Sequence, residues 1–441
     1  WALGRLFQKK NQRDQALQAY RQALEAVQST RSNLLQSRYE VGRKFDESVG
    51  DLYKELTVLL LSEAADKSEE KRALLVEARD TLEKLRVVEL EDYFRDQCVT
   101  DSLQQYRQDS DEPFKQTAVL HMLTTSQTVN ILLTLPNGEI IPRHINVDGA
   151  QFRRQVELLR IELQDVASNQ FFRLSQQIYN YLMKPLESQL SKHNITTLVI
   201  VPDDTLRLIP LSALHDGEQF LIERYVIAAI PALSLTSKQA NPAVVSRALL
   251  GGLSESVQGF SALPHVKSEL QQIRDIYQGD VLLDNKFDVN ALEKTFVEDT
   301  YPIVHIASHG EFGSRPEQSF LLTYDGKITM NRLESLLKSR FQQPVELLTL
   351  SACQTALGDD MSALGLAGIA VKSGAKSALA SLWQVNDKAT AVLITQFYRQ
   401  LKQPGIGKAQ ALQRAQQYML TQNLYRHPTY WSAFLLIGHW Q

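Results

Sequence analysis

Short apolar runs alternate with amphipathic segments throughout residues 241–441, and this alternation constrains the fold more than any other feature of the chain. The runs ALLGG, PIVHIA and VELLTL are apolar along most of their length. The segments between them, such as VKSELQQIRDIY and NRLESLLKS, place apolar residues at helical spacing. Strands that are apolar on both faces are typical of a parallel sheet that helices cover on each side. Residues 241–441 are therefore predicted to form an α/β domain with a mostly parallel sheet.

Residues 1–115 have a different composition. No proline occurs between Gln8 and Asp96, and Ala, Leu, Gln, Glu, Lys and Arg dominate, with apolar residues at helical spacing. This pattern predicts an α-helical bundle or a long helical hairpin. Residues 16–24 resemble one helix of a tetratricopeptide repeat, but we find no second copy at the repeat interval of about 34 residues. We expect this region to contact a regulatory protein partner.

Residues 116–240 begin with alternating apolar and polar residues around the sequence PNGE, which predicts a β-hairpin. One helix is expected at about residues 149–190. Two further apolar runs, in TTLVIVPDD and ERYVIAAIPALS, predict two more strands. This part of the chain is therefore also predicted to contain both strands and helices.

The composition argues against several classes of function. The 47 basic and 50 acidic residues nearly cancel, so no bulk charge points to nucleic acid or to an anionic membrane. The glycines of LLGGLSES lack the Lys-Ser/Thr signature of a phosphate loop, and we expect neither a cofactor nor a metal. The longest apolar run, near Leu56, is too short to span a bilayer, and the first residues do not resemble a signal peptide. Two widely separated cysteines, Cys98 and Cys353, fit a reducing, cytoplasmic compartment.

Two of the predicted strands end in reactive side chains. PIVHIA runs into His309 and Gly310, and VELLTL runs into Cys353. If the strands are parallel neighbours, both ends lie at the same edge of the sheet, where functional groups gather in α/β folds. A cysteine and a histidine placed in this way can act as nucleophile and acid/base group. The backbone N–H groups of Gly310 and Cys353 would then hold the developing oxyanion.

The residues alone leave a second interpretation open. A cysteine at a strand end is more often a small buried hydrophobe than a nucleophile. His305 is expected to be structural, because only His309 reaches the open end of its strand. Cys98 has no histidine or second cysteine at metal-ligand spacing, and we assign it no functional role.

Four stretches of the chain resemble the CHAT domain, a caspase-like module often found beside tetratricopeptide repeats in bacteria: HIASHGEF, LLTLSACQTALG, AGIAVKSGAKSALASLWQVNDKAT and HPTYWSAFLLIGHW. The resemblance extends upstream to about Thr117 and implies a bacterial source. It also implies the fold and the His–Cys dyad that caspases, metacaspases and separases (clan CD) share, with His309 and Cys353 as catalytic residues. Residues 116–240 lack such a pair, and the resemblance makes them a degenerate pseudo-caspase lobe beside a catalytic lobe of residues 241–441.

The same resemblance implies how a substrate would bind. In caspase-like proteases the peptide lies extended beside a strand next to the nucleophile, a form of β-augmentation. Here that strand is SALASLWQV. The backbone of Ser381, Gln384 and their neighbours up to Val385 would pair with the peptide, and Trp383 would form a wall of the site.

An acidic residue in the pocket would select a basic residue before the cut. Asp387 stands where separase-like enzymes carry such a residue, and a carboxylate there favours Arg or Lys. Asp359 and Asp360 would add to the negative field. The alternative role for Asp387 is to cap the helix that follows, for which Asn386 competes. Gln354 departs from the family, in which many members carry an acidic residue after the cysteine.

These observations predict a regulated cysteine endopeptidase that cleaves a specific protein after Arg or Lys through an acyl-enzyme. Two alternatives stay open: a catalytically silent scaffold for protein–protein interaction, and another cysteine-dependent hydrolase such as an acyltransferase or amidase. The intact dyad argues against the scaffold, because a scaffold has no need to keep both residues. The substrate strand argues against the third class.

Overall fold

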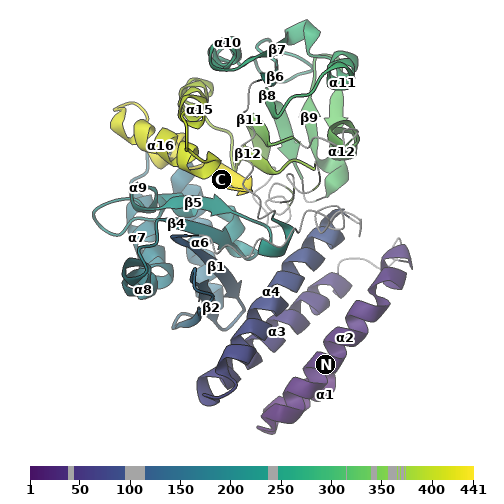
Figure 1. Cartoon of the computed structure of the whole chain (residues 1–441), viewed down its shortest axis with the longest axis vertical. Helices are drawn as coiled ribbons and strands as arrows, with labels where there is room; N and C mark the ends of the chain where they lie inside the picture. Colours follow the sequence, from purple (N-terminus) through teal and green to yellow (C-terminus); the bar gives the residue numbers. More distant parts are fainter. Residues whose placement is uncertain are drawn as a thin grey trace.

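The computed structural model describes residues 1–37, 44–94, 115–236, 247–313, 315–338, 345–355 and 374–441, together with Gly365, Gly368 and Lys372. Within them, a helical N-terminal region lies against one sheet whose two halves are flanked by helices (Figure 1). All 13 strands of the described residues belong to that sheet. The predicted α/β fold, with a mostly parallel sheet and an all-α N-terminal region, is confirmed.

The N-terminal region consists of four helices in its described residues: α1 (Ala2–Lys9), α2 (Arg13–Ser37), α3 (Lys44–Asp66) and α4 (Lys71–Phe94). The first two form a helical hairpin in which Gly4 lies against the ring of Tyr20. A Cβ atom at Gly4 would come within 2.8 Å of that ring, so glycine permits the close packing. The apolar face of this region also buries Leu123 and Leu132 of the neighbouring sheet, so the helices and the sheet share one hydrophobic cluster.

The first half of the sheet combines a parallel trio with an antiparallel meander. Its strands are β1 (Thr117–Thr124), β2 (Val129–Thr134), β3 (Ile140–Ile145), β4 (Thr197–Val201) and β5 (Val226–Ala229). Their spatial order is β5-β4-β1-β2-β3, with β1 parallel to β4 and antiparallel to β2. The predicted hairpin turn lies between β2 and β3, where Gly138 has a φ of 80° that glycine adopts without strain.

The single helix expected at residues 149–190 is wrong. The structure has three helices there, α6 (Gly149–Gln164), α7 (Gln170–Leu182) and α8 (Glu187–Lys192). Asp165 and Ser168 accept hydrogen bonds from the backbone two residues onward, at 3.0 Å each, and these local turns compete with the helix. Pro185 interrupts the helical hydrogen bonding a second time, because it has no N–H to donate.

The second half of the sheet contains the strands that the apolar runs predicted. They are β6 (Arg247–Gly252), β7 (Gln278–Leu283), β8 (Ile303–Phe312), β9 (Phe320–Leu322), β10 (Lys327–Thr329), β11 (Leu347–Thr355), β12 (Ser377–Ser381) and β13 (Phe434–Gly438). The helices α10 (Val266–Ile276), α15 (Asp387–Leu401) and α16 (Lys408–Thr421) flank one side of this half (Figure 1). The helices α11 (Val289–Glu298) and α12 (Met330–Lys338) lie on the other.

The two halves join through β13. This strand is antiparallel to β12 and parallel to β5, which it meets at the pair Ile437 and Ala229. One hydrophobic core extends across both halves, from Ala118 to Trp440. The predicted lobe boundary near residue 240 falls outside the described residues and stays a prediction, but no break in the sheet or the core accompanies it.

Helix α4 contacts both halves of the sheet. Its buried Glu83 accepts hydrogen bonds from His121 Nε2 at 2.5 Å and from the backbone N–H groups of Leu233 and Ser234 at 3.1 and 2.9 Å. Burial by itself would raise the pKa of Glu83, but these donors outweigh it and lower the pKa to about 2.

Among the described residues, no helix is both long and apolar enough to cross a membrane.

The contribution of Glu83 on α4 to the stability of the protein should depend on pH over a defined acidic range. The lowered pKa of Glu83 contributes to stability fully above its ordinary value of 4.5, and this contribution is lost as the pH falls toward 2. Glu83→Gln should remove a contribution on the order of 3 kcal/mol at neutral pH and flatten the pH dependence below 4.5. Urea unfolding of both proteins at several pH values measures this.

The matched control is Glu77→Gln, whose carboxylate pairs with Arg21 at the surface. A surface pair of this kind contributes about 0–1 kcal/mol. If Glu83→Gln followed the same pH curve as the wild type, Glu83 would not be the group that links α4 to acid stability.

Candidate functional site

The strands β8 and β11 are parallel neighbours, as predicted. Leu350 pairs with Ile306, but the register then shifts, so that Ala352 pairs with His309 and Cys353 with Gly310. The shift arises from one extra residue in β8, a β-bulge of the kind that re-aims side chains beside functional sites. The backbones of His309 and Cys353 therefore lie on adjacent strands, one register step apart.

The two strands do not end where the sequence predicted. β8 continues to Phe312 and β11 to Thr355, so His309 and Cys353 lie inside the paired region. The reason is β9, which pairs with Gly310 and Glu311 on the side opposite β11. Buried Ser308 strengthens this contact, because its hydroxyl donates to the carbonyl of Leu322 at 2.7 Å. The predicted open strand end was therefore wrong, although the adjacency of the two strands was right.

The imidazole of His309 is held by the loop that precedes α10. Its Nε2 lies 2.8 Å from the carbonyl oxygen of Ser261, and its ring centroid lies 5.2 Å from that of Phe260. A carbonyl oxygen only accepts, so Nε2 is the nitrogen that donates and Nδ1 is the one left for other partners. Of the other predicted site residues, Cys353 is described by its place in the β11 backbone, and Asp359 and Asp360 lie outside the described residues, as does Cys98.

The predicted substrate strand is flanked on both sides over most of its length. β12 pairs with β11 up to Ala380 and with β13 up to Ser381. Trp383 is only 5% exposed, and its Nε1 donates to the carbonyl of Thr429 at 3.2 Å. Gln384 is exposed, and within the described part of the chain its N–H and that of Val385 have no backbone acceptor. The N–H of Leu382 donates to the carbonyl of Ala433 at 2.9 Å, so the segment open to an extended peptide begins only after this residue.

Asp387 lies at the first turn of α15, close to His309. Asn386 caps this helix by accepting from the N–H of Ala389 at 3.2 Å, as the competing interpretation allowed. The carboxylate of Asp387 instead accepts from the backbone N–H of His265 at 2.7 Å. Burial raises the pKa of Asp387, while that N–H and the imidazoles of His265 and His309 partly oppose the rise. Asp387 therefore ties α15 to the start of α10 and stands within electrostatic reach of His309.

A cluster of buried polar side chains lies next to the site in the same two strands and the helices that cover them. Its members are Glu269, His305, Thr349 and Tyr398. His305 pairs in register with Thr349, and Tyr398 joins the two strands. The Tyr398 hydroxyl donates to Thr349 Oγ1 at 2.8 Å and lies 3.3 Å from His305 Nδ1. His305 Nε2 lies 2.9 Å from Glu269 Oε1, within ion-pair distance although their orientation is poor for a hydrogen bond. His305 is fully buried, in keeping with a structural role.

Our reading of the sequence missed Glu269, although a signal was present. Val266, Leu270 and Ile273 mark the buried face of α10, and Glu269 falls on that face at helical spacing. A carboxylate on a buried helix face needs a partner. A histidine in the middle of an apolar strand supplies one.

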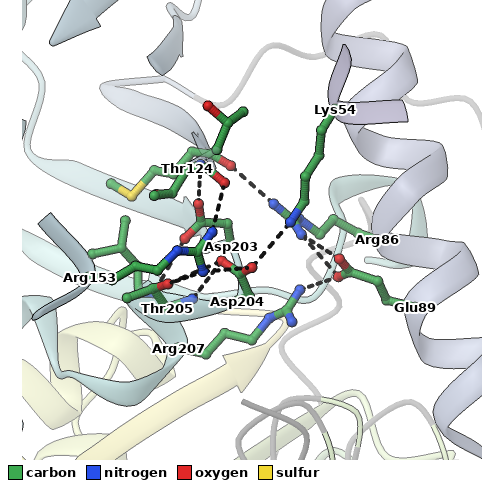
Figure 2. Close-up of polar contacts among 12 residues, drawn as sticks. Lys54, Arg86, Glu89, Thr124, Arg153, Asp203, Asp204, Thr205 and Arg207 are labelled. Atoms are coloured by element: carbon green, nitrogen blue, oxygen red, sulfur yellow. Dashed lines mark hydrogen bonds and ion pairs between the residues drawn. The ribbon is translucent and has the colours of Figure 1, made fainter. Parts of the chain in front are cut away.

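A second buried polar cluster lies at the carboxyl ends of β1 and β4, where our sequence analysis predicted no function (Figure 2). Asp204 binds Lys54 of α3 and Arg153 of α6, each at 3.1 Å. The backbone N–H of Thr124 donates to Asp203, which is completely buried. Burial and the charge of Asp204 raise the pKa of Asp203, whereas the nearby cations lower that of Asp204 despite its burial.

Helix α4 supplies the other half of this cluster. Arg86 donates to Glu89 at 2.9 Å and to the carbonyl of Met122 at 3.1 Å. Glu89 also pairs with Arg207, which follows β4 (Figure 2). Burial would raise the pKa of Glu89, but Arg207, Arg86 and Lys54 lower it to about 2. The strand ends of the first sheet half thus hold a docking site for helices in place of a dyad. In the described part of the chain, no three His, Cys, Asp or Glu side chains are grouped as a metal site requires.

Removing one member of the buried pair of His305 and Glu269 should lower the free energy of unfolding markedly. His305→Leu leaves Glu269 buried without a partner, and breaking a buried pair in this way costs about 3–5 kcal/mol. Replacing both, His305→Leu with Glu269→Leu, should recover most of that loss, because no unpaired charge remains. Urea unfolding of the two variants tests this, with His144→Leu as the control, which removes an exposed imidazole and its hydrogen bond to Asn130 at 3.1 Å and should cost only about 1 kcal/mol. Equal stability of the single and double variants would contradict it.

Two solved structures and one protein sequence are similar to this chain. Tetratricopeptide repeat protein 28 of Homo sapiens is 24% identical over 322 residues, which covers 59% of the chain and 13% of that protein's length. The structure of the Saccharomyces cerevisiae separase–securin complex superposes with a TM-score of 0.53 at 10% identity, covering 96% of the chain and 40% of the matched one. The Porphyromonas gingivalis RgpB structure covers 66% of the chain and 76% of its own, at 9% identity and a TM-score of 0.42.

The separase likeness shows a shared fold across nearly the whole chain, while the chain spans only a fraction of either the separase or the human relative. The family match covers residues 173–439, more than half of the chain. It begins inside α7, so the first strands of the sheet precede it. It includes β8, β11, β12 and the helix α15 that carries Asp387. The chain belongs to the CHAT domain family.

Proposed function

We propose that this chain is a cysteine endopeptidase in which Cys353 is the nucleophile and His309 the acid/base group. The observation that carries the proposal is the register of β8 and β11: Ala352 pairs with His309 and Cys353 with Gly310, so the backbones of His309 and Cys353 are one register step apart. Membership of the CHAT domain family supports it. Gly310 has no side chain that would crowd a carbonyl group between the two strands.

The chemistry follows from these two groups. The Cys353 thiolate attacks the scissile carbonyl carbon, and the carbonyl electrons move to oxygen to form a tetrahedral oxyanion. When the oxyanion collapses, the C–N bond breaks and the His309 imidazolium gives its proton to the departing amine. Water, deprotonated by the neutral imidazole, then attacks the thioester. This step releases the acid and restores the thiolate and the imidazolium.

An extended peptide fits beside the chain that follows β12. The N–H groups of Gln384 and Val385 have no backbone acceptor in the described residues, so they are available for β-augmentation. Asp387 lies just beyond them and close to His309. Its carboxylate would bind the side chain before the cut, and a half-buried carboxylate selects Arg or Lys. Our proposal of a basic specificity rests on this residue.

The N-terminal helices are the natural place for regulation. α4 contacts the first half of the sheet through Glu83 and Arg86 and reaches the second half at its end. We therefore propose that a protein partner acts on α1–α4. A substrate protein and a regulatory partner are both required by this scheme, and a reducing compartment would keep Cys353 as a thiol.

The dyad is tested by two variants with matched controls. Cys353→Ala and His309→Ala should each lower cleavage of a protein or peptide library by at least about a thousandfold, because each removes a covalent or proton-transfer role. Cys98→Ala is the control and should cleave as the wild type does. Product peptides are quantified by mass spectrometry, and unfolding curves verify that each variant is folded. Cleavage that survives Cys353→Ala, or its absence from every preparation including those with partner proteins, would favour the scaffold alternative.

The role of Asp387 is tested by the ratio of the cleavage rates of two substrates. Asp387→Asn keeps an oxygen that accepts from His265, so the fold should be preserved while the charge is lost. The preference for Arg over Gln before the cut should fall about tenfold to a hundredfold, the scale of a charge-assisted hydrogen bond. In the wild type the preference should decline as the pH falls, beginning at a higher pH than for an ordinary aspartate, because burial raises the pKa of Asp387.

A ratio of rates measured on the same enzyme cancels every effect of pH that is common to both substrates. Asp387→Asn should therefore show a low preference that does not change with pH. A wild-type preference that is unaffected by the substitution would assign Asp387 only to the contact between α15 and α10.

A further inference from the structure

The last turn of α4 reaches the chain that follows His309. Tyr93 is 3% exposed, and its hydroxyl donates to the carbonyl of Gly313 at 2.8 Å. Gly313 in turn donates its N–H to Ser319 Oγ at 3.2 Å, just before β9 begins. Gly313 lies four residues after His309 and one residue after the end of β8. A helix of the N-terminal region thus holds the chain that leaves the dyad histidine.

The same turn of α4 also packs against Gly365 and Gly368, two described residues that follow β11 in the chain. A Cβ atom at Gly365 would collide with the Tyr93 hydroxyl, and one at Gly368 would come within 2.6 Å of the Phe94 ring. Lys372 Nζ lies 5.4 Å from the centroid of that ring. Glycine at 365 and 368 therefore allows this segment to approach α4 closely. One helical turn touches the segments that follow both predicted catalytic strands.

The position of this turn is set by the polar cluster of Figure 2. Glu89 and Tyr93 are four residues apart and lie on the same face of α4. Glu89 is paired with Arg207 of the first half of the sheet and with Arg86 of α4 itself, whereas Tyr93 contacts the second half. An α-helix rises about 1.5 Å per residue, so the two contacts are about 6 Å apart along a rigid rod. A displacement of α4 at the cluster must therefore displace Tyr93.

We propose that Tyr93 is a positioning residue for the dyad: its hydroxyl holds Gly313 at the end of β8, and its close contact with Gly365 fixes α4 there, so that His309 keeps its placement relative to Cys353. The proposal rests on the proposed function of that pair. It also assigns a route for regulation, because a partner that moves α4 acts on the dyad through Tyr93. His309 and Cys353 remain the catalytic residues, since Tyr93 touches neither the substrate nor the reacting atoms.

Tyr93→Phe tests the proposal because it removes only the hydroxyl. The rate of Cys353 alkylation by iodoacetamide is followed against pH, with peptide mass spectrometry to separate Cys353 from Cys98. Loosening of the imidazole–thiolate pair should lower the rate at neutral pH about tenfold and move the profile toward higher pH. If the protein cleaves peptides, kcat should fall about tenfold while KM stays within about twofold, as expected for lost placement of reacting groups.

The control is Tyr179→Phe, which removes a hydroxyl that donates to Glu187 at 2.7 Å, far along the chain from α4 and the dyad. It should leave the alkylation profile and kcat unchanged. Gly365→Ala is the second variant. It leaves α4 intact but forces its partner segment away from Tyr93, and should reproduce the shifted profile.

The outcomes are distinct. A wild-type alkylation profile in both Tyr93→Phe and Gly365→Ala would overturn the positioning role, as would an equal shift in Tyr179→Phe. Absence of peptide cleavage by the wild type would count against the proposed protease, but the alkylation profile would still decide the role of Tyr93. Hydrogen exchange of peptides containing Gly313 and Gly365 adds a direct readout, and it should be about fivefold faster in Tyr93→Phe than in the wild type or in Tyr179→Phe.

Discussion

The parallel pairing of β8 and β11 is the constraint on which the candidate site depends. Both strands are central in the sheet and apolar in their lower part, so they are fixed by packing on two faces. Below the site, Tyr398 binds Thr349 on one strand and approaches His305 on the other. Above it, one extra residue in β8 sets Cys353 opposite Gly310. These contacts fix the register on both sides of the β-bulge. A slide of one strand along the other would break either the Tyr398 contacts or the pairing of Cys353 with Gly310.

Helix α4 adds a second constraint. Its charged middle is buried against the strand ends of the first sheet half, and its aromatic end packs against Ala232 and Leu235 of that half while Tyr93 reaches Gly313 of the second. Buried charges are specific in position, because a small displacement leaves a carboxylate or guanidinium without its partner. Aromatic packing against glycines depends equally on distance. The helical region is therefore part of the same structure as the sheet, with geometry that a bound partner can alter.

Much of the fold could be predicted from the sequence because it depends on local patterns. Apolar runs predicted β8, β11 and β12, and the PNGE turn predicted the hairpin between β2 and β3. The predictions failed where a distant segment intervenes. β9 extends the ladder past His309, and short-range hydrogen bonds at Asp165 and Ser168 divide an expected helix. The partnership of Glu269 with His305 joins a helix to a strand 36 residues later, which no periodicity reports.

The sequence by itself determined that two apolar strands carry His309 and Cys353 near their carboxyl ends, because hydrophobic patterning locates buried strands. The prediction of His309 and Cys353 as a catalytic pair needed, in addition, the resemblance of the surrounding sequence to the CHAT domain. The tertiary structure alone decided the register between them, the tie from Asp387 to His265, and the contact of Tyr93 with Gly313. These depend on hydrogen bonds between segments separated by tens to hundreds of residues. Such contacts form only once the chain is folded, so local sequence patterns do not predict them.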